Sequence, residues 1–476
     1  MEASPAAGVC YLCRMLQSPL AQTIAALSIR ERQELRHWVL SPAFNRRPEV
    51  LHLYDWLCAR LEQPGPETVS ARAVAQAHLA ADEPGLRHTM SFLFRVVKQY
   101  LAWREWSSDA LAPRLSLCRA LRKKGLAAVF DKEFKQIPKP DPAAPQHAGL
   151  QLQRYQLHFE HWEAQHRSGP TDITQLAAAN EAFGLFVALK ALRHGCAALD
   201  QAGLLPPEEV AWLSESLAAV EAGRYAGAAA VQAYYRCFKL MQSGEEQHFQ
   251  PLKTLLAGPG DMLPADELRD VYLVAINFCI KKLNTGVRRY IREALDLYRS
   301  GLVRQVIQDN GVLAKATYQN ILLLAIAVEE WDWARDFLEQ YRSALPSGER
   351  HNAYHFNLAL YYFRKKDYPA AQDILRRVEF RDVFHNLDAR RMLVRIYFDT
   401  GAVQALDSLL HSFKIYLQRH RNIGYHRELN GNFVRAVQQL LRLEPGDAAA
   451  REKLRQRIAA EGYVAEREWL LQQLEK

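Results

Sequence analysis

The sequence lacks the short motifs by which the common catalytic folds are recognised. It contains no P-loop, no G-x-G-x-x-G dinucleotide motif, no H-E-x-x-H zinc motif and no G-x-S-x-G nucleophile elbow. We therefore expect a protein that is not an enzyme and uses no cofactor. No residue is predicted to be catalytic, and none is predicted to bind a metal.

Cysteine is sparse and long apolar runs are missing. The seven cysteines are odd in number and scattered, unlike the paired cysteines of a secreted disulfide framework. No stretch approaches the roughly 20 uninterrupted apolar residues of a membrane span. The first basic residue, Arg14, follows the apolar patch Val9–Leu12, which is not the order of a secretory leader. We expect a cytoplasmic protein with reduced thiols and no membrane association.

Neither sign of charge dominates. Sixty-one Lys and Arg stand against 53 Asp and Glu, a net charge of +8 over 476 residues. This excess allows an acidic partner but is smaller than that of a dedicated DNA-binding protein. Hydrophobic residues make up 49% of the chain, so a large core is expected.

The sequence does contain a helical repeat. Residues 354–378 read YHFNLALYYFRKKDYPAAQDILRRV. From Tyr354, large apolar residues recur at i+4, i+7 and i+8, the spacing of one helical face. Pro369 then opens a second helix, and the small residue Ala371 falls where the two helices would cross. This order is typical of the tetratricopeptide (TPR) repeat.

The pattern recurs on both sides of this segment. Ala334 and Ala405 occupy the position of Ala371, at separations of 37 and 34 residues, close to the 34-residue TPR period. We predict an all-α, TPR-like α-solenoid of helical hairpins with a helical N-terminal module. Its predicted parts are the module 1–112, degenerate hairpins 113–300, TPR-like repeats 301–445 and a C-terminal helical cap 446–476.

The N-terminal module has its own helix signals. Ser28 and Glu31 form a capping-box pattern before a helix over 29–40. Further helices are expected over 49–61, 70–80 and 86–106. Because residues 30–47 are locally basic, a winged-helix DNA reader is an alternative to a simple helical cap, but no stretch supplies the β-hairpin of a wing.

Three segments carry a family resemblance: LSPAFNRR at 40–47, YYFRKKDY at 361–368 and VEFRDVFHNLDARR at 378–391. In them the chain resembles a family of uncharacterised bacterial TPR-like helical proteins, along nearly its whole length. That resemblance implies a fold and no activity. The wider TPR resemblance implies a right-handed solenoid whose helix A residues line a concave groove for a partner segment. Arg390 departs from the pattern, because a large apolar residue is usual there.

Basic residues gather in the last third of the chain. Positions 390–427 hold seven Lys or Arg against two acids, with four histidines nearby. Arg391 and Arg395 lie one helical turn apart, at positions that the TPR resemblance places in the groove. Because arginine binds carboxylate or phosphate with two parallel hydrogen bonds, we predict that they anchor an acidic protein or peptide partner, with Arg364 and Phe398 as weaker contacts. The alternatives are a solvated basic face, or salt bridges with Asp382 and Asp388.

The sequence also contains weaker signals for nucleic-acid binding and for metal binding. Nucleic-acid binding by the basic third or the N-terminal module is the main rival, although Phe398 and Tyr416 are weak stacking candidates. Cys10-x-x-Cys13 has zinc spacing without a second pair. Glu163 and His166 have the spacing of a di-iron ligand pair, but a second such motif is missing. No oligomeric state is predicted.

Overall fold

The chain folds as helices. The computed structural model describes residues 15–62, 83–138, 145–166, 173–201, 205–258, 262–378, 382–420, 422–444 and 446–475. Within these residues every extended regular element is helical, and the sole strand-like contact is an isolated bridge between Asp309 and Val312. The all-α class expected from the sequence is confirmed. The predicted helix over 70–80, Cys10, Cys13 and most of the proline-rich stretch 138–145 lie outside the described residues.

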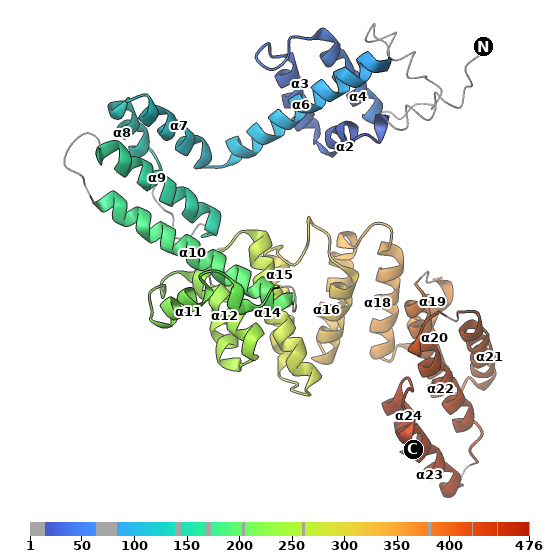
Figure 1. The fold of residues 1–476 in the computed structure, drawn as a ribbon. Helices are drawn as coiled ribbons and strands as arrows, with labels where there is room; N and C mark the ends of the chain where they lie inside the picture. Colours follow the sequence, from blue (N-terminus) through green and yellow to red (C-terminus); the bar gives the residue numbers. More distant parts are fainter. Residues whose placement is uncertain are drawn as a thin grey trace, which may run out of the picture. The chain divides into compact units, whose positions relative to one another are not determined.

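The helices divide into two compact units, a coarser partition than the four predicted parts, and α10 belongs to both. Unit 1 comprises residues 1–140 and 149–184, with helices α2 (Pro19–Ala26), α3 (Ile29–Leu40), α4 (Pro48–Glu62), α6 (Glu83–Ser108), α7 (Ala112–Lys123), α8 (Ala127–Lys135), α9 (Ala148–His166) and the start of α10 (Thr174–Asp200) (Figure 1).

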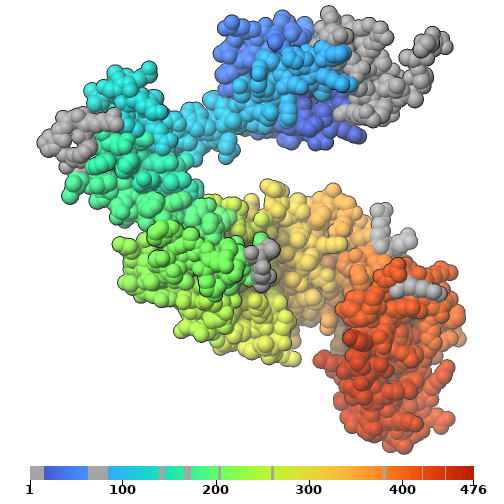
Figure 2. Space-filling model, viewed as in Figure 1, coloured from blue at the N-terminus to red at the C-terminus, as the bar shows by residue number. Residues whose placement is uncertain are grey.

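Unit 2 comprises residues 141–148 and 185–476. After α10 it contains α11 (Leu213–Glu221), α12 (Ala229–Ser243), α13 (Phe249–Ala257), α14 (Ala265–Asn284), α15 (Tyr290–Val303), α16 (Lys315–Ala327), α17 (Trp331–Gln340), α18 (Arg350–Arg364), α19 (Tyr368–Arg377), α20 (Val383–Asp399), α21 (Val403–Arg419), α22 (Tyr425–Leu440), α23 (Ala448–Ala460) and α24 (Arg467–Glu475). Side chains fill the space between α12, α14, α15 and α16 (Figure 2). One continuous apolar core extends along the unit to Leu474.

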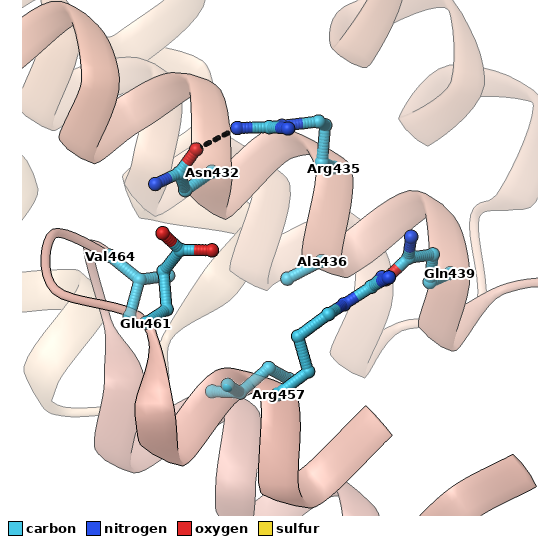
Figure 3. Close-up of a pocket in the computed structure, with 8 residues that line it drawn as sticks. Asn432, Arg435, Ala436, Gln439, Arg457, Glu461 and Val464 are labelled. Atoms are coloured by element: carbon cyan, nitrogen blue, oxygen red, sulfur yellow. Dashed lines mark hydrogen bonds between the residues drawn. The ribbon is translucent and has the colours of Figure 1, made fainter. Parts of the chain in front are cut away.

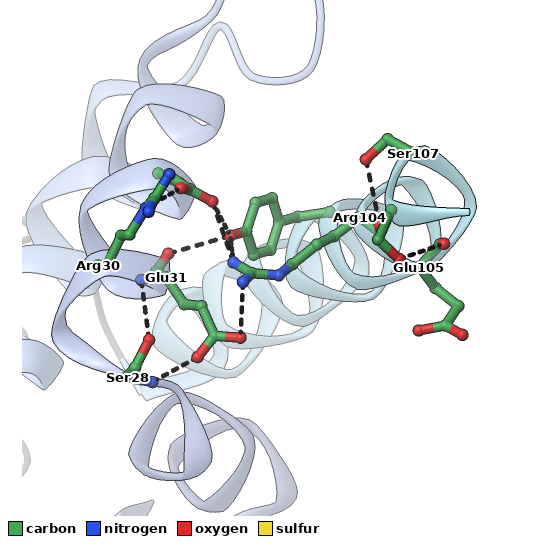
Figure 4. A network of polar contacts seen from close by, with 9 residues as sticks. Ser28, Arg30, Glu31, Arg104, Glu105 and Ser107 are labelled. Carbon is green, nitrogen blue, oxygen red and sulfur yellow. Dashed lines mark hydrogen bonds and ion pairs between the residues drawn. The ribbon is translucent and has the colours of Figure 1, made fainter. Parts of the chain in front are cut away.

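The N-terminal bundle is organised around the start of α3. The Ser28 side chain accepts from the Glu31 N–H at 3.3 Å, and the Glu31 carboxylate accepts from the Ser28 N–H at 2.6 Å (Figure 4). The predicted capping box is thereby confirmed. Arg104 on α6 ion-pairs with Glu31 and Glu34 at 3.2 and 3.0 Å. These partly exposed pairs orient the two helices, whereas burial of apolar residues between them supplies most of the stability.

Three consecutive hairpins of unit 2 share one turn. In α16/α17, α18/α19 and α20/α21 the second residue after the first helix adopts a left-handed conformation, with φ of 61° at Glu329, 64° at Lys366 and 67° at Gly401. The following N–H donates to a carbonyl five residues back, at 3.0, 2.9 and 2.9 Å. This is the Schellman arrangement, which satisfies helix-terminal carbonyls while reversing the chain.

The small residues lie where the hairpin pattern requires them. Ala334 and Ala371 are fully buried, and Ala405 is half-buried against the same core. The α19 helix begins as predicted, with Pro369 in its first turn and the Asp367 carboxylate accepting from the Ala370 N–H at 3.3 Å.

Two helical segments are interrupted. Over residues 207–222 a short 3-10 turn, Pro207–Glu209, is followed by Trp212 at φ 64°, and α11 begins only at Leu213. The C-terminal segment is divided near Gly462 into α23 and α24. Residues 461–466 form the turn between them.

One described helix, α10, is long and apolar enough to cross a membrane by length and composition. It has 27 residues, a mean hydropathy of 1.3 in its most apolar window, and 39% of that window is buried. Its second half contributes Ala188, Leu189 and Leu192 to the core of unit 2. The finding is weak, because a core helix of a globular protein has the same composition. The absence of membrane association stays a prediction.

Candidate functional site

The predicted anchors Arg391 and Arg395 lie one turn apart on α20. The helix begins at Val383 and is capped by Asp382, whose carboxylate accepts from the N–H groups of Phe384 and His385 at 2.8 and 3.0 Å. The helix register turns both arginines toward the C-terminal segment of the chain. Only 18% of the Arg391 side chain and 22% of the Arg395 side chain are exposed.

Glu466, in the turn before α24, binds both arginines. Its carboxylate lies 2.7 Å from the Arg395 guanidinium and 3.5 Å from Nε of Arg391. Arg391 also donates to Asp388 on its own helix and, at 3.1 Å, to Asn430 on α22. Both predicted anchors are therefore paired within the chain, as in one alternative drawn from the sequence. Asp388 takes part in this pairing, whereas Asp382 caps the helix.

Burial shifts the pKa values of the carboxyl and imidazole groups around Arg391. Burial raises the pKa of Asp388, and the neighbouring Arg391 only partly opposes the shift. Burial also lowers the pKa of His385, whose ring stacks on Phe356 at a centroid distance of 4.2 Å. His385 therefore adds positive charge only at a lower pH than an exposed histidine would.

Phe398 and Arg364 have different surroundings. Phe398 packs edge-to-face against Trp469 of α24, with ring centroids 5.2 Å apart, and is half-buried. The Arg395 guanidinium lies over both Phe363 and Trp469, at 4.9 and 5.5 Å. Arg364, at the end of α18, is exposed and outside this network. Three of the four predicted contacts, Arg391, Arg395 and Phe398, therefore lie close together, and the chain's own C-terminal segment packs against them.

The structure also presents exposed aromatic residues that the sequence reasoning did not select. Phe384, Tyr425 and Tyr463 are 48%, 57% and 52% exposed. His426 lies between Phe384 and Tyr425, at centroid distances of 4.8 and 4.2 Å, and Tyr425 lies 6.0 Å from Tyr463. We call these four residues the aromatic strip. It crosses the first turns of α20 and α22 and the 461–466 turn.

The strip is connected to the arginine network through α22. The Asn430 side chain accepts from Arg391 and donates to the His426 carbonyl at 2.7 Å. A sequence signal for the strip existed: Phe384 and Tyr425 are aromatic residues in first helical turns, outside the buried stripes of their helices. Large apolar side chains in such positions indicate a surface used for contact.

The other basic residues of this region differ in exposure. The Arg390 guanidinium lies 4.6 Å from the centre of the Tyr416 ring, and burial lowers its pKa. Lys414, Arg419 and Arg427 are exposed, and Arg421 lies outside the described residues.

The suspected metal ligands are not assembled into a site. Glu163 ion-pairs with Arg122 at 3.0 Å, and the His166 side chain lies outside the described residues. Among the residues that the structure describes, no group of three or more His, Cys, Asp or Glu side chains is placed to hold a metal. The five described cysteines are free thiols, and burial raises the pKa of Cys196 to about 12.

Comparisons of the chain with protein-family models, with curated proteins and with solved structures return no match. The resemblance to a TPR-like family stays a prediction, and the candidate site rests on the geometry of this chain.

Proposed function

We propose that the protein is a non-catalytic, TPR-like α-solenoid that binds a segment of a partner protein. The solenoid is supported by the three hairpins with a common turn and by the buried alanines at their crossings. In such an arrangement the first helices of successive hairpins, α16, α18, α20 and α22, line a concave groove. The free thiols fit the reducing cytoplasm expected from the sequence.

The aromatic strip is the observation that carries this proposal. Aromatic side chains supply large contact area at low entropic cost, and Tyr is enriched where proteins bind one another. Phe384 and Tyr425 lie on neighbouring first helices, so one extended or helical segment could cover both. A partner segment with an apolar anchor fits this surface.

The arginine network modifies the predicted acidic anchor. Glu466 and Asp388 already pair with Arg391 and Arg395, so a partner carboxylate would have to compete with them. We propose that the strip supplies most of the affinity and that Arg391, held by Asn430, positions α22 beneath it. Acidic residues of the partner would then add charge complementarity along the exposed Lys414 and Arg427.

The test is affinity purification of the tagged protein from its own cells, with and without nuclease. We expect a small set of proteins that survives nuclease and is reduced at least about tenfold by Phe384→Ala/Tyr425→Ala, since each truncated anchor removes about 1 kcal/mol or more. The matched control is Val303→Ala/Val403→Ala, which truncates two apolar side chains that are 83% and 59% exposed, away from the strip.

Two outcomes oppose the proposal. Equal capture by the strip variant and the control would remove the strip from the binding surface. Recovery of nucleic acid alone, with an affinity that falls steeply with salt, would favour the rival nucleic-acid function.

A further inference from the structure

A second arginine pair lies on the other side of the 461–466 turn, in a pocket between α22 and α23. The cavity measures about 130 Å³. Arg435 on α22 and Arg457 on α23 line it on either side of Ala436, with the Arg435 guanidinium turned toward Asn432 and the Arg457 guanidinium toward Gln439, and Glu461 lines a third side (Figure 3). Ala436 and Ile458 are buried beneath it and give it an apolar floor.

The two guanidinium groups are held by neutral acceptors. Arg435 donates to the side-chain oxygen of Asn432, and Arg457 donates to that of Gln439. Among the described residues, no carboxylate oxygen lies within 4.0 Å of either guanidinium. A guanidinium carries five N–H donors, so most donors of each group are left for a ligand. Arg391 and Arg395, in contrast, are already paired with two carboxylates, those of Glu466 and Asp388.

The pocket is built on fixed groups. Asn432 is only 4% exposed, and its amide N–H donates to the Tyr463 carbonyl at 2.7 Å. This bond directs its oxygen toward Arg435. Arg467 donates to the carbonyls of Glu461 and, at 3.2 Å, Gly462, which holds the turn after α23. The acceptor Asn432 and the turn are therefore fixed, whereas Arg435 and Arg457 are themselves exposed and can turn their donors toward a ligand.

We propose that this pocket binds a phosphoryl group. Two positive charges against the single carboxylate of Glu461 leave a net positive site, which selects an anion. A carboxylate has two oxygens in one plane and can be satisfied by a single arginine fork. A phosphoryl group has oxygens on several sides and can be held by two forks that approach from different helices.

The volume of the pocket limits the size of the group that can enter it. A space of about 130 Å³ holds a phosphoryl group and leaves the rest of a larger ligand outside. The same chemistry is offered by inorganic phosphate, by a phosphorylated metabolite and by a phosphorylated side chain. Glu461 opposes the ligand's charge and lowers its affinity.

The test measures phosphate binding by the full chain at constant ionic strength, through calorimetry and the concentration-dependent rise of the melting temperature. Arg435→Gln and Arg457→Gln should each weaken binding about tenfold or more, because each removes a charge-assisted contact. Glu461→Gln should tighten binding. Arg455→Gln is the matched control, because Arg455 lies on the same helix, is exposed and pairs with Glu452 at 2.7 Å.

The results of these binding measurements do not depend on whether the protein binds the proposed partner. Tighter binding of O-phosphoserine than of phosphate identifies a phosphorylated side chain as the source, and the reverse identifies a free phosphate. Acetate binding as tight as phosphate binding overturns the phosphoryl assignment. No binding at tens of millimolar phosphate, or undiminished binding by a folded Arg435→Gln/Arg457→Gln variant, overturns the site.

Discussion

Glu466 is the residue on which the candidate site depends most. It binds Arg391 and Arg395 although its own φ of 54° lies in the left-handed region, which a side chain other than glycine rarely adopts. Such a conformation costs about 1 kcal/mol or more and persists where surrounding contacts enforce it. The ion pairs with the two guanidinium groups are two such contacts, and the Ala465 N–H, which donates to the Leu429 carbonyl at 3.1 Å, is a third.

Glu466→Gln should therefore loosen the C-terminal segment. The substitution keeps the shape of the side chain but removes its negative charge, which lies between two half-buried arginines. Because the carboxylate is 27% exposed, we expect a loss of about 1–2 kcal/mol in the free energy of unfolding of unit 2, below the range of fully buried pairs. Urea unfolding and faster hydrogen exchange in α24 would measure it.

The matched control is Glu468→Gln, two residues away, exposed and outside every ion pair among the described residues. Equal effects of the two substitutions would contradict the role given to Glu466. Partner capture gives a second readout: if a partner carboxylate competes with Glu466, Glu466→Gln strengthens capture.

At the scale of elements, the shared turn explains how the hairpins close. A left-handed φ carries no steric penalty for Gly401, whereas for Lys366 it costs conformational free energy. The two turns therefore have the same geometry but differ in the free energy needed to adopt it. Gly401→Ala should lower the free energy of unfolding by about 1 kcal/mol, and Lys366→Gly should raise it by up to about 1 kcal/mol. Nothing lies within 4 Å of a Cβ added at Gly401, so its effect would be conformational.

Urea midpoints of the two variants, compared with the wild type, provide the measurement. Shifts of the same sign would argue against a common turn. Arg364→Gly, at an exposed position whose φ is not left-handed, controls for the general cost of glycine near the end of α18.

Some features of these helices and turns could be predicted from the sequence and others could not. Helix starts were predictable because their signals are local, as with Ser28 and Glu31 or with Pro369. The burial of Ala334 and Ala371 followed from the repeat period. Left-handed turns at Glu329 and Lys366 were not predictable, because neither residue favours that conformation.

The candidate site was less accessible to prediction, because its contacts are distant in sequence. Arg395 was predicted as an anchor for a partner, but in the structure its guanidinium donates to Glu466, which is 71 positions away. A helical period locates a side chain on a face and does not identify what covers that face. The aromatic strip likewise joins three segments that only folding brings together.

At the scale of the whole molecule, α10 is the shared element of two units. Its second half supplies Ala188, Leu189 and Leu192 to the core of unit 2, where Arg193 also pairs with Glu267 at 2.6 Å. Since nearly all of that core lies between Ala188 and Leu474, unit 2 has the contacts needed to fold once α10 is complete.

We therefore expect the fragment 173–476 to unfold cooperatively in urea at a midpoint close to that of one transition of the full chain, because the second half of α10 stays packed in its core. The matched fragment 201–476 lacks α10, exposes the surfaces of α12 and α14 that it covers, and should lose cooperativity or aggregate. Circular dichroism followed through both titrations distinguishes them. If the shorter fragment unfolds as cooperatively as the longer one, α10 is only a connection between the units. If neither does, unit 2 needs residues before 173 for its fold, either unit 1 or its own segment 141–148.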